Sequence, residues 1–251
     1  QIPNVIRVEN PYFYRCPWNS RTFEECGELA LRNLEQVLQY ENPDSIAAIL
    51  MEGESGSSGC LKYPPFYLKR VKEICEKYGI LFICDETMSG FGRTGKMFAV
   101  EHHGVTPDIM VGAKGLTSGY LPLGMVMVTD TIAKHFDNNF LAIGLTYSAH
   151  AVACAAAIEN IRILESEKMV ENAASIGDKI IGPGLRDLAK KHQVMGDIRG
   201  AGVFWGIDMV SDQKSRQPLA PYGASSPKMN EIVATCKKNG LMPFNNFNRI
   251  H

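Results

Sequence analysis

The sequence lacks the features that mark membrane-spanning, secreted or nucleic-acid-binding proteins. Its 251 residues contain no apolar run of membrane-spanning length and no segment that resembles a signal peptide. The formal net charge is -1 and no basic patch is present, so neither nucleic acid nor a membrane is an expected partner. The seven cysteines are scattered without a CxxC pair, which is typical of reduced thiols in a cytoplasmic protein.

The composition is that of an ordinary globular chain. Hydrophobic residues make up 45% and charged residues 21% of the sequence, which is enough for a sizeable core. The predicted elements of the first part, in chain order, are a strand over 45–51, a helix over 66–78 and strands over 80–84, 108–111 and 123–128, then a helix over 149–165. This alternation predicts an α/β fold with a mostly parallel sheet and flanking helices.

The pattern changes after residue 165, where we expect a smaller α+β domain. Its predicted elements are a helix interrupted at Gly182–Gly184, a β-ribbon and a last helix, over 168–192, 196–210 and 227–239. We therefore expect a large domain over 1–165 and a small carboxy-terminal domain over 166–251. Because the chain starts without methionine and stops within a predicted strand, we expect both domains to be incomplete.

A lysine and an aspartate each follow a buried strand of the predicted sheet. Lys114 follows the strand over 108–111, and Asp85 follows the strand over 80–84. The carboxyl ends of parallel strands meet at one edge of a sheet, where ligands bind. A lysine that forms a Schiff base and an acid that keeps a ring nitrogen protonated are the two groups that a pyridoxal phosphate enzyme needs. The pair therefore predicts pyridoxal phosphate as the cofactor.

Thr146 is a third candidate, because it precedes the alanine-rich helix predicted over 149–165. A hydroxyl near a helix N-terminus suits a phosphate group, which the helix dipole and the unpaired N–H groups attract. Each of the three residues also has a structural interpretation by itself. Asp85 would cap the loop that follows it, Lys114 would stand in a surface loop, and Thr146 would be an N-cap or turn residue. The combination of Asp85, Lys114 and the Gly115–Gly119 turn favours the functional interpretation.

Three segments that carry these residues resemble the signature segments of class III aminotransferases, which have the aspartate aminotransferase fold. The segments are Asp85–Gly95, Ala113–Gly119 and Leu145–Ala155. The resemblance covers nearly the whole chain. It implies that Lys114 forms the Schiff base and moves the substrate proton, while Asp85 pairs with the pyridine nitrogen. It also implies that Thr87 packs on the ring and that Thr146 reaches the phosphate of the neighbouring subunit, in a homodimer with shared active sites.

Two positions depart from the family pattern and bear on the substrate. Met88 is expected beside the cofactor, where many members have a glutamine near its phenolic oxygen. Ser57 stands where ornithine and 4-aminobutyrate enzymes carry a second glutamate. The combination resembles the branch that acts on ω-amino acids and amines. We therefore expect transamination of a donor such as taurine, β-alanine or a simple amine, with pyruvate or 2-oxoglutarate as the acceptor.

Other functions stay open at this stage. A racemase, an aminomutase or a phospho-lyase of the same family would use the same lysine and cofactor. A truncated homologue would instead act as an assembly or regulatory module without catalysis. The family's upstream phosphate-binding loop, its ring-stacking aromatic and its downstream carboxylate-binding arginine are not recognised in the sequence. We therefore expect an internal fragment that binds pyridoxal phosphate weakly and transaminates poorly alone.

Two further motifs are interpreted as structural. Gly90–Gly95 matches a dinucleotide-binding fingerprint, but the segment after it is too short for the required helix and no suitable acid follows. His102 and His103 are adjacent, so their side chains point to different sides of a helix, and no third ligand is near in sequence. We therefore expect neither a nucleotide site nor a metal site.

Overall fold

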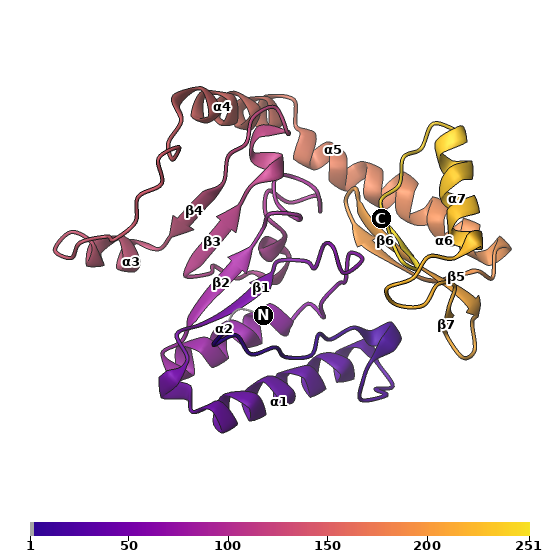
Figure 1. Cartoon of the computed structure of the whole chain (residues 1–251), viewed down its shortest axis with the longest axis horizontal. Helices are drawn as coiled ribbons and strands as arrows, with labels where there is room; N and C mark the ends of the chain where they lie inside the picture. The colour runs from indigo at the N-terminus through magenta and orange to yellow at the C-terminus, as the bar shows by residue number, and fades with distance from the viewer. Residues whose placement is uncertain (1–2) are drawn as a thin grey trace. The chain divides into compact units, whose positions relative to one another are not determined.

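The computed structural model describes residues 3–251, which divide into two compact units (Figure 1). Unit 1 comprises the chain up to Gly53 together with Tyr63–Thr87 and Val100–Ile158. Unit 2 comprises Glu54–Lys62, Met88–Ala99 and Glu159–His251. Each unit contains a β-sheet of its own. The expected division into domains over 1–165 and 166–251 stays a prediction.

Unit 1 is built on a four-stranded sheet in the order β1-β2-β3-β4. The strands are β1 (Ala48–Glu52), β2 (Leu81–Asp85), β3 (Ile109–Gly112) and β4 (Met125–Val128). The first three strands are parallel, and β4 runs antiparallel to β3. The link between β3 and β4 contains only a short 3-10 helix, and a parallel return needs a longer crossover. The predicted α/β class and mostly parallel sheet are confirmed.

The first two helices of unit 1 lie side by side along the sheet (Figure 1). Helix α1 (Phe23–Glu41) begins after Thr22, whose side chain accepts a hydrogen bond from the Glu25 N–H at 3.1 Å. Helix α2 (Tyr67–Tyr78) ends at Gly79, which adopts the left-handed conformation with φ 66°. This confirms the predicted helix and its glycine end. Helix α3 (Asp130–His135) also belongs to unit 1, and helix α4 (Ala151–Ser166) begins in unit 1 and ends in unit 2.

Asp108 ties helix α2 to the sheet. Both of its carboxylate oxygens accept hydrogen bonds from Lys72 Nζ at 2.8 Å, and its Oδ2 also accepts one from the Phe82 N–H at 2.8 Å. Burial acts to lower the pKa of Lys72, but the hydrogen bond to Asp108 and the charge of that carboxylate raise the pKa above its ordinary value. The ion pair therefore anchors the helix between β1 and β2 to the start of β3.

Strands β1 and β2 have a covered face and an open face. Ile49, Met51, Phe82 and Cys84 alternate along β1 and β2 and are all buried. Leu50 lies between two of them, points to the opposite face, and has 63% of its surface exposed. Strands with apolar side chains on both faces are typical of sheets that are covered on both sides. In β1 and β2, the side chains on the face of Ile49 are therefore covered, and Leu50 on the opposite face stays exposed.

Unit 2 carries a second sheet in the order β5-β6-β9-β8, with β7 paired to β6. Its strands are β5 (Met195–Ala201), β6 (Phe204–Asp212), β7 (Gln217–Pro218), β8 (Asn245–Asn246) and β9 (Arg249–Ile250). Strands β5 and β6 form an antiparallel hairpin, with Gly202 in its turn at φ 54°. This confirms the predicted β-ribbon. A core of Met195, Met209, Ala220 and Met229 packs the hairpin against helix α7 (Pro227–Lys238).

The predicted interruption at Gly182–Gly184 is wrong. Helix α5 (Met169–Ile176) continues through a π-helical turn (Gly177–Ile181) into helix α6 (Gly182–Lys191). Pro183 stands in the first turn of α6, where a missing N–H and a fixed φ are tolerated. The wide π turn just before it absorbs the irregularity that proline would otherwise impose on the helix. Within residues 3–251, no helix combines the length and the apolar character that crossing a bilayer requires.

We expect the two faces of β1 to respond differently to truncation. Ile49→Ala removes buried methyl groups and should lower the free energy of unfolding by about 2–5 kcal/mol. Leu50→Ala, the matched control on the open face, should lower it by less than about 1 kcal/mol. Urea unfolding followed by circular dichroism measures both values. An equal loss of unfolding free energy in the two variants would show that the face of Leu50 is also covered in solution.

Candidate active site

Asp85 ends β2 and its side chain organises the turn that follows. Its Oδ1 accepts a hydrogen bond from the Thr87 N–H at 2.8 Å, and its backbone carbonyl accepts one from the Gly53 N–H at 3.2 Å. The residue is half-buried, and its neighbour on β1 is Glu52. Within residues 3–251, Oδ2 has no hydrogen-bond partner, so this oxygen is available to a cationic group. Asp85 therefore caps its loop and still presents a carboxylate oxygen.

Lys114 stands at the same edge of the sheet. Val111 of β3 lies opposite Asp85 in the parallel register, and Lys114 follows just beyond it. Adjacent strands are about 4.8 Å apart, so the ends of β2 and β3 are direct neighbours. Lys114 begins a 3-10 helix (Lys114–Thr117) with φ 45°, and its side chain is exposed. A non-glycine residue in this left-handed region costs about 1–3 kcal/mol, and such strain is often found at functional sites.

Glu86 is a residue of this region that sequence reasoning missed. It is fully buried, and its Oε1 accepts hydrogen bonds from the Val100 N–H at 2.7 Å and from the Cys84 thiol at 3.8 Å. Burial, together with the charge and hydrogen bond of Glu86, raises the pKa of Cys84. The buried carboxylate therefore fixes the chain on both sides of Asp85. The sequence feature that could have identified Glu86 is its position directly after the candidate acid Asp85.

Thr87 and Met88 are adjacent in sequence but belong to different units. Thr87 is half-buried in unit 1, and its N–H is held by Asp85. Met88 belongs to unit 2, where its side chain packs against Gly56; a Cβ placed on Gly56 would lie 2.6 Å from Met88 Cβ. Ser57 directly follows Gly56, so the structure brings together the two positions that depart from the family pattern. The expected places of Thr87 and Met88 beside a cofactor stay predictions.

The loop that contains Ser57 is held by the strands of unit 2. The Ser58 carbonyl accepts a hydrogen bond from Arg249 Nη1 at 2.6 Å, and the Ser57 carbonyl accepts one from Asn246 Nδ2 at 3.2 Å. Lys62 Nζ donates to the Gly200 carbonyl at 3.3 Å. The loop is therefore attached at several points to β5, β8 and β9 of its own unit.

Thr146 lies in an exposed turn that precedes α4. The helix starts at Ala151, later than predicted, and among the described residues Thr146 makes no hydrogen bond to its N-terminus. The structure thus places Thr146 in the turn and does not show it as an N-cap. Its expected role toward a phosphate of a second subunit stays a prediction.

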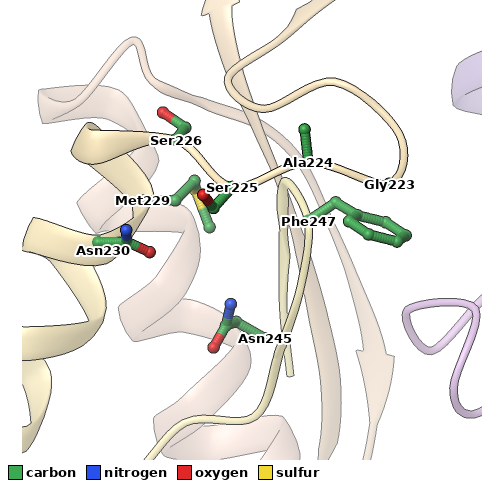
Figure 2. A pocket seen from close by; sticks show the side chains of 8 residues that line it. All are labelled: Gly223, Ala224, Ser225, Ser226, Met229, Asn230, Asn245 and Phe247. Carbon is green, nitrogen blue, oxygen red and sulfur yellow. The ribbon is translucent and has the colours of Figure 1, made fainter.

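Unit 2 also contains a small pocket beside the start of α7, shown in Figure 2, with a volume of about 240 Å³. The residues that line it are Gly223, Ala224, Ser225, Ser226, Met229, Asn230, Asn245 and Phe247. Its polar groups are uncharged hydroxyls and amides, and it contains none of the predicted site residues. Among the described residues, no group of three or more His, Cys, Asp or Glu side chains is arranged to hold a metal ion.

Comparison with known sequences gives a consistent set of relatives. A family model described as "Aminotransferase class-III" matches residues 1–249. Adenosylmethionine-8-amino-7-oxononanoate aminotransferase of Staphylococcus aureus is 39% identical over 247 residues, which cover 94% of this chain and 52% of that protein. Taurine–pyruvate aminotransferase of Rhodobacter capsulatus is 34% identical over 244 residues, which cover 94% of this chain and 51% of that protein. The chain thus spans about half the length of the curated relatives that it matches.

Solved structures show the same likeness. Taurine:2-oxoglutarate aminotransferase from Bifidobacterium kashiwanohense, in complex with PLP and glutamate, superposes with a TM-score of 0.94 at 37% identity. The match covers 99% of this chain and 56% of that one. An amine transaminase from an uncultivated Pseudomonas species, in its PLP-bound form, superposes with a TM-score of 0.91 at 35% identity. The match covers 97% of this chain and 55% of that one.

The left-handed backbone at Lys114 gives a stability prediction that is independent of any ligand. Lys114→Gly and Lys114→Ala both remove the amine, but only glycine adopts φ 45° without strain. The glycine variant should therefore have a free energy of unfolding about 1 kcal/mol higher than the alanine variant. Urea unfolding of the two proteins side by side provides the measurement. An alanine variant as stable as the glycine variant would show that the backbone at this position is unstrained.

Proposed function

Because the chain belongs to the class III aminotransferase family, we propose that it supplies the lysine and the acid of a pyridoxal phosphate site in an enzyme that transfers amino groups. The observation that carries the proposal is the parallel register of β2 and β3. It sets Asp85 opposite Val111 and thereby places Asp85 and Lys114 at neighbouring strand ends. Parallel sheets bind ligands at this edge.

The residues at this edge fit the cofactor. When bound, pyridoxal phosphate supplies an aldehyde that condenses with amines and a ring that accepts electrons. Oδ2 of Asp85 has no partner within residues 3–251 and suits a protonated ring nitrogen, because a carboxylate stabilises an adjacent cation. Lys114 offers a primary amine on a flexible chain that solvent and substrate can reach. Asp85 is anchored by the Thr87 N–H, so its carboxylate is already oriented.

We assign Lys114 the movement of the substrate proton. Its Nζ accepts a proton from the carbon that bears the amino group and returns a proton during the second half of the reaction. The Asp85 carboxylate would hold the proton of the ring nitrogen of the bound cofactor. Glu86 is a positioning residue. Its buried carboxylate accepts a hydrogen bond from the Val100 N–H and thereby keeps the segment after β2 in place.

For the substrates, we propose an ω-amino acid or amine such as taurine or β-alanine as the donor and pyruvate or 2-oxoglutarate as the acceptor. Two observations support this choice. Relatives named for taurine transamination match nearly the whole chain, and Met88 packs against the loop position next to Ser57. The serine side chain at position 57 presents no carboxylate to an approaching donor. All the relatives described above carry the name of an aminotransferase or a transaminase, which favours this reaction over racemisation, amino-group migration or phosphate elimination.

We also propose that the active form is a homodimer in the cytoplasm. Residues 140–147, before α4, expose five large apolar side chains: Phe140, Leu141, Ile143, Leu145 and Tyr147. Such a patch marks an interaction surface, and Thr146 lies within it. A second copy that covers this patch would bring Thr146 toward the other subunit. The seven free cysteines fit a reducing compartment.

The proposal is tested by reducing the chain with borohydride in the presence of pyridoxal phosphate. Intact-mass analysis and peptide mapping should find one stable adduct, located on Lys114. Lys114→Ala should abolish the adduct, whereas Lys134→Ala, which removes an exposed lysine of α3, should leave it unchanged. An adduct on another lysine would refute the assignment. A chain that stays colourless and unmodified would favour the non-catalytic alternative.

Asp85→Asn separates the structural role of Asp85 from its electrostatic role. Asparagine still accepts the Thr87 N–H, so the free energy of unfolding should stay nearly constant. Loss of the charge should raise the Kd for pyridoxal phosphate by about 10-fold to 100-fold, the usual cost of a lost hydrogen bond to a charged group. Titration followed by absorbance measures the Kd. Asp130→Asn, on the surface of α3, is the matched control, and an unchanged Kd in Asp85→Asn would exclude a role beside the cofactor.

A further inference from the structure

Two cysteines of unit 1 are in direct contact and take no part in the proposed active site. Cys16 follows a short 3-10 helix (Phe13–Arg15), and Cys26 lies in the first turns of α1. The Cys26 thiol donates a hydrogen bond to Cys16 Sγ, with 3.1 Å between the sulfur atoms. A disulfide bond is about 2.0 Å long, so the sulfur atoms need to approach by only about 1 Å to form one.

The two thiols have unequal environments. Burial acts to raise the pKa of Cys16, but hydrogen bonding to its sulfur, including that from the Cys26 thiol, brings the pKa below its ordinary value. Burial, reinforced by the hydrogen bond and the charge of Cys16, raises the pKa of Cys26 to about 12. Cys16 is therefore the more acidic thiol of the pair, and Cys26 is the less acidic one. The same direction is seen in the hydrogen bond, in which Cys26 is the donor.

Solvent access follows the same order. Cys16 keeps 9% of its surface exposed, whereas Cys26 is fully buried. A more acidic thiol that keeps a little solvent exposure, in contact with a fully buried and less acidic thiol, is an arrangement that suits a redox-active cysteine pair. Cys60, Cys75 and Cys84 are also buried.

We propose that peroxide oxidises the thiols of Cys16 and Cys26 to a disulfide, which links the amino-terminal segment to helix α1. The oxidant is hydrogen peroxide. The Cys16 thiolate attacks one peroxide oxygen, the O–O bond breaks, and hydroxide leaves and takes up a proton to become water. Cys16 is then a sulfenic acid. Cys26 attacks the Cys16 sulfur, the S–O bond breaks, and the proton of Cys26 leaves with the hydroxyl group as a second water. Both sulfur atoms are oxidised and the peroxide is reduced.

The disulfide would act at a packed junction of unit 1. Gly27, the neighbour of Cys26, packs against Pro64 and Phe66, which lead into α2; a Cβ on Gly27 would lie 2.7 Å from Pro64 Cγ. Oxidation would therefore fix the amino-terminal segment to α1 where α1 meets the start of α2. This inference does not rest on the proposed transamination.

The inference is tested by treating the chain with hydrogen peroxide, blocking free thiols by alkylation, and mapping peptides without reduction. We expect the protein to lose two hydrogen atoms in mass, with the Cys16 and Cys26 peptides linked. Dithiothreitol should restore both thiols, and Cys154 and Cys236, which are half-buried, should stay alkylatable. If the two peptides stay unlinked while other thiols oxidise, or if either cysteine links elsewhere, the pair is not a redox unit.

Single variants test the assigned order of events. In Cys26→Ala, Cys16 should accumulate as a sulfenic acid that dimedone traps. In Cys16→Ala, peroxide should consume the Cys26 thiol at least about tenfold more slowly than it consumes Cys16 in the parent chain, because a thiol that stays protonated is a poor nucleophile. Cys236→Ser is the control and should form the Cys16–Cys26 link at the parent rate. Fast oxidation of Cys26 in Cys16→Ala would reverse the proposed order. Should a variant fail to fold, the peptide map of the parent chain decides the question.

Discussion

The parallel pairing of β2 with β3 is the constraint on which the candidate site depends. The register places Asp85 opposite Val111, and Lys114 follows at the same edge of the sheet. A slip of one residue would turn every side chain of a strand to the other face. Ile49, Phe82 and Cys84 prevent such a slip, because it would move their buried side chains to the open face. The core of the sheet and the geometry of the site are therefore set by the same register.

The segment from Asp85 onward shows how a flexible sequence becomes a defined site. Glycine and serine are frequent in it, and the local sequence alone does not hold it in one conformation. Order comes from buried polar contacts, in which Asp85 holds the Thr87 N–H and Glu86 holds the Val100 N–H. In unit 2, Arg249 and Asn246 hold the Ser57 loop in the same way. The Ser57 loop is thus fixed by contacts to distant residues, and the segment after β2 is fixed by one local contact and one to Val100.

Much of the fold could be predicted because local signals agree with the tertiary structure. The apolar runs became β1, β2 and β3, and Gly79 ended α2 in the left-handed conformation that only a few residue types adopt readily. The signal at Gly182–Gly184 misled, because proline is compatible with the first turn of a helix as well as with a break. The spacing of apolar residues does not reveal a π-helical turn. The sequence therefore did not predict that α5 continues through such a turn into α6.

The sequence by itself determined the family, the fold class and the identity of the candidate acid and lysine, because these depend on residue types at fixed spacing. The tertiary structure decided which residues from separate segments come into contact, which the spacing of residues in the sequence does not show. It placed Asp85 and Lys114 at neighbouring strand ends, packed Met88 against Gly56, and brought the sulfur atoms of Cys16 and Cys26 to 3.1 Å. The physical reason is that each of these contacts joins residues on separate segments. Only the burial of the surrounding side chains specifies which segments meet.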